Sequence, residues 1–457
     1  MYASPLTRTG QYRVKRVIET TVTGPVTREP KDLRELRDIL DPNTRMPLPI
    51  RIQGAGSACT GCNVSETGTT VRMTRLDRII NVDSYNHTAT VQAGVLVADL
   101  VKELAEYGLE LAGGYDLAGR TVGGAVSAPC FGPSIGNSGT YFASSVTGLK
   151  MIRADGHMLK VDSSQKNLLG SFRSSLGMLG VIHEVTLKVR PIRTFKASHR
   201  RVTIDKFASI VDALANADVG IKFYLMPYRD RVYLDIRRYE ADPGNTYAAP
   251  WKLKDWGEST VLPHIFASLN RVVPMQSMRY KLIDSISEAT QGLVNSKFVN
   301  AGSNAASLTD PRGKRTVRRS FYSTWCFPAA NFSMVVRAYR DFCQQIYANS
   351  GFRCDMPAVG YRLGRDSSSL LSPSFDEPMI ALRAATTQEK GWDDFVIDFA
   401  EFAEKWGGLP LISQSRAMRA EHVIQSYNKR LDFFRHMRRK VDPDNRLLSP
   451  FMAQFMQ

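Results

Sequence analysis

The sequence lacks the features typical of membrane-spanning, secreted and disulfide-rich proteins. No stretch approaches the roughly 18 consecutive apolar residues of a membrane-spanning helix, so no spanning helix is expected. The first ten residues lack the apolar core of a signal peptide. The 6 cysteines are too few for a disulfide scaffold in a chain of 457 residues. These absences predict a cytoplasmic, reduced protein, with peripheral contact at a membrane left open.

Acidic residues are also scarce relative to basic ones. The chain has 60 Lys and Arg against 44 Asp and Glu, a net charge of +16. Such a charge favours anionic partners such as phosphorylated substrates, anionic lipid or nucleic acid, although a solvated basic surface is an equal alternative. The basic run Arg312–Arg319 contains no aromatic residue, which argues against nucleic-acid binding. The length predicts two or three domains with ample core.

The most informative stretch is a loop of small residues. Ile50 and Ile52 alternate as in a short strand, and Gly54–Ala58 (Gly-Ala-Gly-Ser-Ala) follows. Successive amides in such a loop can form an anion-binding nest, with phosphate as the expected ligand. A Rossmann motif would require a helix directly after the last glycine. Cys59–Val71 has no helical period, so we expect a phosphate loop between strands instead.

The same stretch contains Cys59-x-x-Cys62. A structural zinc site needs a second pair of ligands at suitable spacing, and none is nearby. We therefore expect no metal site and two unpaired thiols in a tight loop.

Further along, regular elements alternate with segments of small residues. Gly113–Ser127 is rich in Gly, Ala and Ser, and its adjacent Gly123 and Gly124 permit close approach of backbone to something flat, so we expect a buried, ligand-lining segment. Leu176–Ile182 is another glycine-bearing apolar run. The patterns predict helices over Pro30–Leu40 and Val97–Leu104, strands at Val17–Val22, Val71–Met73, Ile79–Val82, Ala89–Ala93 and Val181–Val189, and a hairpin turning at Asp155-Gly156.

After about residue 195 the composition of the sequence changes. Residues 240–320 are mixed and give no clear element. The remaining patterns predict paired strands at Ile221–Leu225 and Arg231–Ile236, a strand at Met379–Ala385, and helices over Phe332–Ala348, Trp392–Trp406 and Glu421–Val441.

The order of these motifs resembles the FAD-linked oxidases of the vanillyl-alcohol-oxidase type, and within them the sugar-lactone (aldonolactone) oxidases and the decaprenylphosphoryl-ribose oxidase. The resemblance covers about residues 20–195 and returns at Val359–Arg383 and Arg438–Pro443. It implies an α+β fold, with a two-part FAD-binding domain of that type and a cap domain built on an antiparallel sheet. We expect the FAD-binding domain over residues 1–195, the cap over 196–420, and a C-terminal segment, 421–457, that returns to the FAD domain.

The resemblance also assigns cofactor contacts by position. The phosphate loop would hold the pyrophosphate, the Thr-Val-Gly-Gly segment would line the flavin, and the third segment would pass near the adenine half. In that order, the residues are Gly54, Ala55, Gly56, Ser57 and Ala58; Thr121, Val122, Gly123, Gly124 and Ser127; and Gly177, Gly180 and Ile182.

Several positions depart from the related enzymes. Many lactone oxidases bond a histidine covalently to the flavin where this chain has Ser57, so no histidyl link is expected there. Cys130 lies near the flavin-lining segment, and some relatives use a cysteine tether. A buried free thiol is the more common state, so we predict non-covalent FAD. A dithiol relay through Cys59 and Cys62 is a rarer alternative.

The substrate-facing groups also differ. The Glu-x-Arg of the lactone oxidases reads Gly360-Tyr361-Arg362 here, and a later run has lost its histidine and lysine. The resemblance implies an FAD-dependent oxidoreductase that takes a hydride to flavin N5 from a C–H next to a hydroxyl of a sugar, lactone or related alcohol. The alternative is an oxidase subunit that acts on a lipid-linked sugar at the membrane surface. The electron acceptor would be O2 or another acceptor, and the candidate catalytic residues are Tyr361, Arg362, Gln414 and Arg416.

Overall fold

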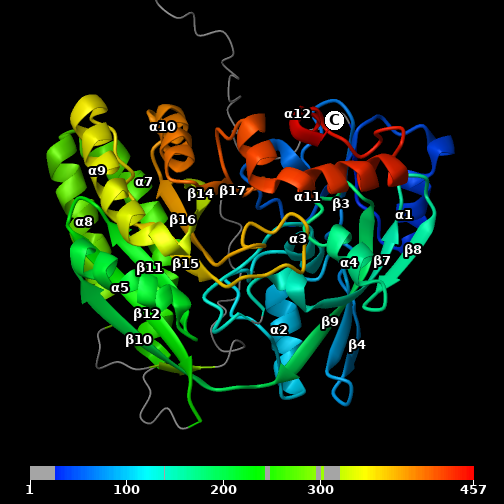
Figure 1. The fold of residues 1–457 in the computed structure, drawn as a ribbon, viewed down its shortest axis with the longest axis horizontal. Coiled ribbons are helices and arrows are strands. Elements are labelled where there is room, and N and C mark those ends of the chain that lie inside the picture. Colours follow the sequence, from blue (N-terminus) through cyan, green and yellow to red (C-terminus); the bar gives the residue numbers. More distant parts are fainter. Residues whose placement is uncertain (1–25, 138, 242–247, 295–299, 303–319, 457) are drawn as a thin grey trace, which may run out of the picture.

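The computed structural model describes residues 26–137, 139–241, 248–294, 300–302 and 320–456. The expected strand Val17–Val22 and the basic run Arg312–Arg319 lie outside these residues. The chain forms two halves that lie side by side, one around two small sheets and the other around a single large sheet (Figure 1).

The first half contains a parallel three-stranded sheet and a second sheet that is antiparallel. The parallel sheet has the order β1-β3-β2, and the antiparallel one has the order β4-β5-β9-β7-β8, with β6 paired to β9. The strands are β1 Val26–Arg28, β2 Ile50–Gln53, β3 Thr69–Arg72, β4 Ile79–Asp83, β5 Thr88–Gln92, β6 Leu109–Leu111, β7 Val146–Ile152, β8 Met158–Asp162 and β9 Val181–Pro191.

The described residues of this half also form the helices α1 Leu33–Leu40, α2 Val97–Glu106, α3 Val122–Ser127 and α4 Lys166–Phe172. The expected helices match α1 and α2, and the expected hairpin matches β7 and β8, with Gly156 at φ +80° in the turn. Only a short 3-10 turn, Gly61–Asn63, follows the phosphate loop, in agreement with the strand–loop–strand prediction. The sequence analysis assigned no regular element to Val122–Ser127; these residues form a short helix that the Thr121 side chain caps, and most of them are buried as expected.

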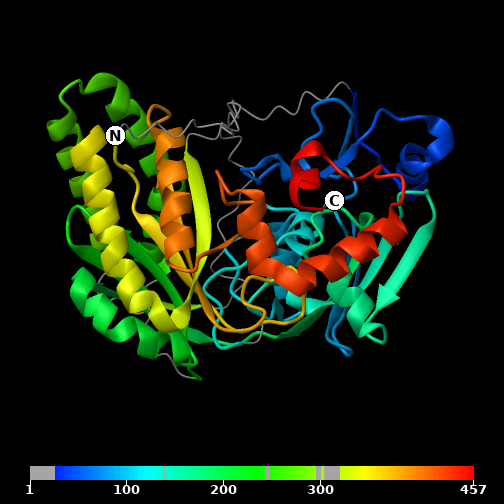
Figure 2. The same ribbon diagram turned by 45° about the horizontal axis from the view of Figure 1, so that its top comes forward.

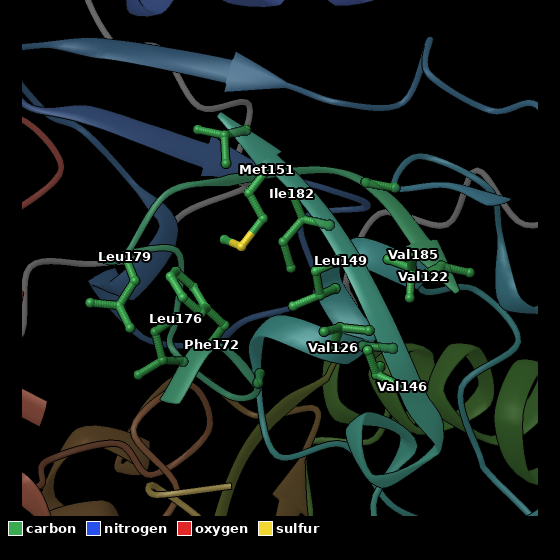
Figure 3. Close-up of a cluster of buried hydrophobic side chains, with 14 of the residues drawn as sticks. Val122, Val126, Val146, Leu149, Met151, Phe172, Leu176, Leu179, Ile182 and Val185 are labelled. Carbon is green, nitrogen blue, oxygen red and sulfur yellow. The ribbon is translucent and has the colours of Figure 1, made fainter. Parts of the chain in front are cut away.

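The core of the first half is apolar and continuous. Val122 and Val126 of α3 pack against Leu149 of β7 and Val185 of β9, and Leu176 and Phe172 lie beside them (Figure 3). The short helix α3 is therefore held rigidly over the sheet, because its valines are fully buried. This packing fixes the segment that connects the helix to the cavity described below.

The second half is built on an eight-stranded antiparallel sheet of order β13-β10-β12-β11-β15-β16-β14-β17. Its strands are β10 Phe195–Val202, β11 Gly220–Met226, β12 Arg231–Tyr239, β13 Asn300–Gly302, β14 Phe321–Pro328, β15 Ala358–Leu363, β16 Met379–Thr386 and β17 Leu409–Pro410. The pairing of β11 with β12 confirms the two strands predicted from the sequence.

The two faces of this sheet differ sharply. One face carries residues such as Phe223 and Leu382, and the helices α5 Ile204–Asn216, α9 Phe332–Ser350 and α10 Trp392–Lys405 cover it (Figure 2). The opposite face carries Lys222, Tyr224 and Asp235, and it looks toward the first half and toward a second group of helices. This group comprises α6 Ala248–Trp256, the π-helical turn η4 Gly257–Val261, α7 Leu262–Val272 and α8 Gln276–Gly292, none of which the sequence analysis had identified.

The chain ends by returning to the first half. Helix α11, Ala420–Val441, runs across the top of the molecule, and α12, Pro450–Met456, follows it (Figure 1). Leu431 and Phe434 of α11 belong to the same core as β5 and β9. The helix is kinked at Asn428, whose φ of 41° is non-helical. The return of the C-terminal segment therefore agrees with the fold expected from the resemblance, while the limits of the three expected segments stay a prediction.

Candidate active site

A deep cavity lies where the three segments of small residues meet. It is lined by the loop after β2, by α3 and by the turn that leads into β9. Of the expected cofactor residues, Val122 alone does not line it, because its side chain points into the core. The lining residues are Gly54, Ala55, Gly56, Ser57, Ala58, Thr121, Gly123, Gly124, Ser127, Gly177, Gly180 and Ile182, together with Ile52, Cys62, Asn63, Met73, Ala93, Arg120, Ala128, Leu176 and Ser413.

This cavity, called the cofactor cleft below, has the properties that a dinucleotide requires. Within the described part of the chain, the backbone N–H groups of Gly54, Ala55, Gly56 and Ser57 donate to no other residue. A row of backbone amides without partners can bind an anion, so this loop is suited to pyrophosphate. A Cβ on Gly54 would stand 2.1 Å from Thr121 Oγ1, which shows how closely the loop approaches α3. The residues present therefore fit FAD.

Polar side chains gather at one end of the cofactor cleft. Arg120 donates to the Cys130 sulfur at 3.2 Å, and the Tyr322 hydroxyl donates to the Ser57 carbonyl at 2.7 Å. Burial acts against the charge of Arg120, but the nearby thiols and Tyr322 outweigh it and raise its pKa. Arg120 thus supplies a fixed positive charge beside the phosphate loop. The sequence analysis did not identify Arg120 as a site residue, although Arg120 directly precedes the expected Thr121.

A bridge of hydrogen bonds leads from this cleft to a second cavity. The Gln414 backbone carbonyl accepts from the Cys59 thiol at 3.1 Å, and its side-chain oxygen accepts from Arg383 at 3.3 Å. Arg383 also lies over the ring of Tyr322, 5.1 Å from its centre. Gln414, one of the expected catalytic residues, is therefore buried between the two cavities and holds Arg383.

The second cavity, called the substrate pocket below, lies between the charged face of the large sheet, the loop at Tyr115–Ala118 and the helices α6–α8. The Tyr361 hydroxyl donates to Asp116 Oδ2 at 2.8 Å, and Lys222 Nζ lies 3.1 Å from the same oxygen. These contacts join residues of the two halves. Asp116 and Lys222, like Arg383, were not expected from the sequence.

The charges of this trio are coupled. The Lys222 ammonium holds the pKa of the Asp116 carboxyl well below its usual range. Burial and the Asp116 carboxylate raise the pKa of Tyr361 to about 12. Burial opposes the charge of Lys222, but Asp116 together with Tyr224, Tyr361 and Glu258 outweighs burial, so the pKa of Lys222 is raised. At neutral pH the pocket therefore holds a carboxylate, an ammonium and a neutral phenol in contact.

Arg362 requires a correction. It is the next residue on β15 after Tyr361, so its side chain points to the other face of the sheet. There it donates to the carbonyls of Ala215 at 2.6 Å and Gly136 at 2.9 Å, and it lines neither cavity. The structure therefore does not support the expected role of Arg362 at the flavin or the substrate, because Arg362 lies on the face of the sheet opposite to Tyr361.

Arg416, the fourth expected catalytic residue, also lines neither cavity. Its guanidinium lies 3.7 Å from Asp393 of α10, on the far side of β14 from the substrate pocket. Among the described residues, no group of three or more His, Cys, Asp or Glu side chains could hold a metal ion.

Comparison with known proteins accounts for both halves. Residues 25–162 match the model of the FAD binding domain, and residues 185–455 match the model described as D-arabinono-1,4-lactone oxidase. The second match spans more than half of the chain. The protein belongs to the D-arabinono-1,4-lactone oxidase family. It is accordingly an FAD-dependent oxidoreductase that acts on CH–OH groups.

Curated relatives match the chain over different lengths. Mouse L-gulonolactone oxidase is 22% identical over 443 residues, covering 93% of this chain and 94% of its own. L-Gulono-1,4-lactone dehydrogenase of Mycobacterium tuberculosis is 25% identical over 202 residues, 44% of this chain and 46% of its own. Among solved structures, cholesterol oxidase from Brevibacterium sterolicum superposes with a TM-score of 0.73 at 13% identity, over 94% of each chain. That likeness shows the vanillyl-alcohol-oxidase fold expected from the sequence.

Proposed function

We propose that the protein oxidises a sugar lactone, or a closely related sugar, at a C–H bond next to a hydroxyl group. The bridge from the cofactor cleft through Gln414 to Arg383 carries this proposal, because it places a charged, hydroxyl-binding pocket directly beside the cleft that fits FAD. The relatives are named for lactones, which supports a lactone as the substrate.

The charge of the pocket agrees with a neutral, hydroxylated substrate. Four acids line it, Asp116, Asp235, Asp255 and Glu258, against the cations Lys222, Arg237 and Arg383. A fourth cation, Lys254, is fully buried behind them. Matched donors and acceptors without excess charge suit hydroxyl groups better than a carboxylate or a phosphate. This balance favours a free lactone over a sugar carried on a lipid phosphate, and no helix among the described residues is long and apolar enough to cross a membrane.

In this proposal the polar residues nearest the cofactor cleft have separate roles. Arg383, held by Gln414 and Thr324, binds a substrate oxygen and orients the ring. Tyr361 takes the proton of the reacting hydroxyl and passes its own proton to solvent by way of Asp116, whose side chain is exposed, while Lys222 fixes that carboxylate. FAD, when bound, supplies the hydride acceptor. Arg120 and the amides of the phosphate loop hold the dinucleotide, and with Ser57 in the loop we propose that it is bound non-covalently.

Anaerobic titration tests the proposal. The purified, yellow protein is mixed with L-gulono-1,4-lactone, L-galactono-1,4-lactone or D-arabinono-1,4-lactone, and the flavin absorbance is followed. Bleaching by at least one lactone is expected, and recovery on admitting air would identify O2 as an acceptor. FAD-loaded protein that no lactone bleaches would refute the substrate assignment. Acid precipitation should leave the flavin in the supernatant, whereas flavin in the pellet would show a covalent link.

A further inference from the structure

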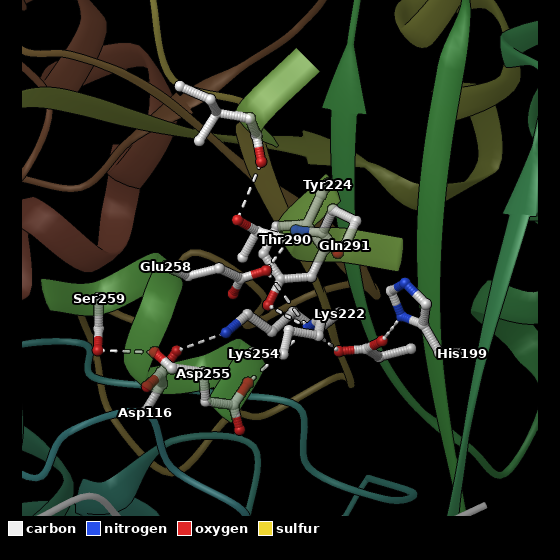
Figure 4. Close-up of polar contacts among 12 residues, drawn as sticks. Asp116, His199, Lys222, Tyr224, Lys254, Asp255, Glu258, Ser259, Thr290 and Gln291 are labelled. Atoms are coloured by element: carbon white, nitrogen blue, oxygen red, sulfur yellow. Dashed lines mark hydrogen bonds and ion pairs between the residues drawn. The ribbon is translucent and has the colours of Figure 1, made fainter. Parts of the chain in front are cut away.

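The substrate pocket has a second end, farther from the cofactor cleft, that the proposed chemistry does not use. Tyr361, Asp116 and Arg383 lie at the first end. Helices α6–α8 and the turn η4 form the second with Asp255, Glu258 and Gln291 (Figure 4), and Ser287 of α8 also lines it. Lys222, which pairs with Asp116 at 3.1 Å, lines the same pocket. The pocket therefore has polar groups beyond those that the proposed chemistry uses.

A buried lysine organises this second end. The Lys254 side chain is fully buried, and its ammonium lies 3.4 Å from Glu258 Oε1, 3.4 Å from Asp235 Oδ2 and 3.3 Å from the Tyr224 hydroxyl. An ammonium has three N–H groups, so these three acceptors saturate it. Burial acts against its charge, but the carboxylates outweigh burial and raise the pKa of Lys254. The cation is thus permanent, and it fixes Glu258 from behind.

Glu258 lies on the π-helical turn η4, between α6 and α7. Such wide turns often occur at functional sites. Its Oε1 atom accepts a hydrogen bond from Gln291 Nε2 of α8 and forms an ion pair with Lys254. Its Oε2 atom accepts no hydrogen bond from any residue in the described part of the chain. One oxygen of an oriented carboxylate at the pocket wall is therefore left for a ligand.

We propose that Glu258 binds the exocyclic hydroxyl groups of the substrate and selects lactones that carry a polyol side chain. The inference rests on the proposed lactone oxidation. A carboxylate oxygen accepts strong hydrogen bonds from hydroxyl groups. Lys254 acts as a positioning residue, since it contacts Glu258 and does not itself line the pocket. The ring reacts at the first end, and the side chain lies along the pocket past Lys222.

Three lactones of increasing length provide the test. Erythrono-1,4-lactone has no exocyclic carbon, D-arabinono-1,4-lactone has one, and L-gulono-1,4-lactone has two that each carry a hydroxyl. We expect Glu258→Gln to raise KM for the longest lactone about tenfold to hundredfold, the loss typical of a hydrogen bond to a charged group. The shortest lactone should be almost unaffected, and kcat should be retained for both.

Two further variants separate recognition from structure. Glu288→Gln removes an acid from α8 that pairs with Arg229 and does not line the pocket, so it should leave all three KM values unchanged. Lys254→Met should reproduce the length-dependent rise in KM, and Lys254→Arg should restore part of it. If Lys254→Met does not fold, Glu258→Gln alone decides the inference.

The outcomes distinguish this inference from the proposed function. Wild-type protein that oxidises no lactone would refute both. Wild-type protein that oxidises lactones, with a Glu258→Gln variant whose KM changes equally for short and long substrates, would refute only the role of Glu258.

Discussion

The cofactor cleft and the substrate pocket are adjacent but are built by different means. The cleft offers mainly backbone amides and small side chains from three short segments, each continuous in sequence. The pocket offers charged side chains from β11, β12 and β16, a tyrosine from β15, and further charged side chains from helices and from a loop of the other half. The cofactor cleft thus presents backbone groups to a cofactor that many enzymes share. The substrate pocket presents side chains, which can change without altering the fold.

The largest expected effect concerns proton transfer in the pocket. Tyr361→Phe removes the hydroxyl that bonds Asp116, and kcat for lactone oxidation should fall by about 10²–10⁴, the usual contribution of a positioned acid or base. FAD content should stay normal, since Tyr361 does not line the cofactor cleft. Tyr427→Phe is the matched control, because Tyr427 also loses one buried hydrogen bond, to Pro410, away from both cavities. Equal losses in the two variants would contradict a chemical role for Tyr361.

The two arginines on neighbouring strands test which face of the sheet meets the substrate. Arg383→Met should lower kcat/KM by about 10²–10³, the effect of losing one donor that acts on a reacting oxygen. Arg362→Met should instead lower the melting temperature and leave kcat/KM of the folded protein near normal, because its partners, two backbone carbonyls and the Asn137 side chain, lie outside the pocket. Steady-state kinetics and thermal unfolding measure both effects. The reverse pattern would instead support the catalytic role expected for Arg362 from the sequence.

A smaller effect is expected in the cofactor cleft. Gly54→Ala places a methyl group 2.1 Å from Thr121 Oγ1 and should weaken FAD binding about tenfold to hundredfold, because overpacking costs about 1–3 kcal/mol. The double variant with Thr121→Ala should recover part of the affinity, since the nearest atom is gone. Gly292→Ala, where the methyl group meets nothing within 4 Å, is the control. FAD titration by fluorescence measures all four proteins, and failure of the double variant to recover would refute the steric cause.

The smallest effect is on acid stability. Burial alone would raise the pKa of Asp235, but Lys254 and His199 outweigh it and hold the pKa well below its usual range. Asp235 therefore contributes stability above its unfolded pKa of about 3.9 and loses it as the pH falls, about 1.4 kcal/mol for each unit of depression. The difference in unfolding free energy between wild type and Asp235→Asn should be largest above about pH 4 and shrink below it. A difference that does not vary with pH would exclude this coupling.

The contrast between the two cavities also explains what the sequence could reveal. Glycines in the loop after β2 and before β9 are local signals, because positive φ and close approach demand them whatever the rest of the chain does. Asp116, Lys222 and Arg383 give no local signal, because they meet only after distant strands pair. The position of Arg362 was missed for the same reason. The spacing of a motif does not show which face of the sheet a strand residue occupies, and adjacent residues lie on opposite faces. The helices α6–α8 were missed because their mixed composition gives weak periodicity.

The kink at Asn428 divides α11 into two parts that pack against different halves of the molecule. Before it, His422 packs edge-on against Trp325 of the large sheet, and after it Leu431 and Phe434 complete the core of the FAD-binding half. The nucleotide-binding half therefore lacks part of its interior until the last 40 or so residues emerge during synthesis. The half built on the large sheet is complete in sequence earlier, so the cofactor cleft gains the support of this core only after the last residues have been made.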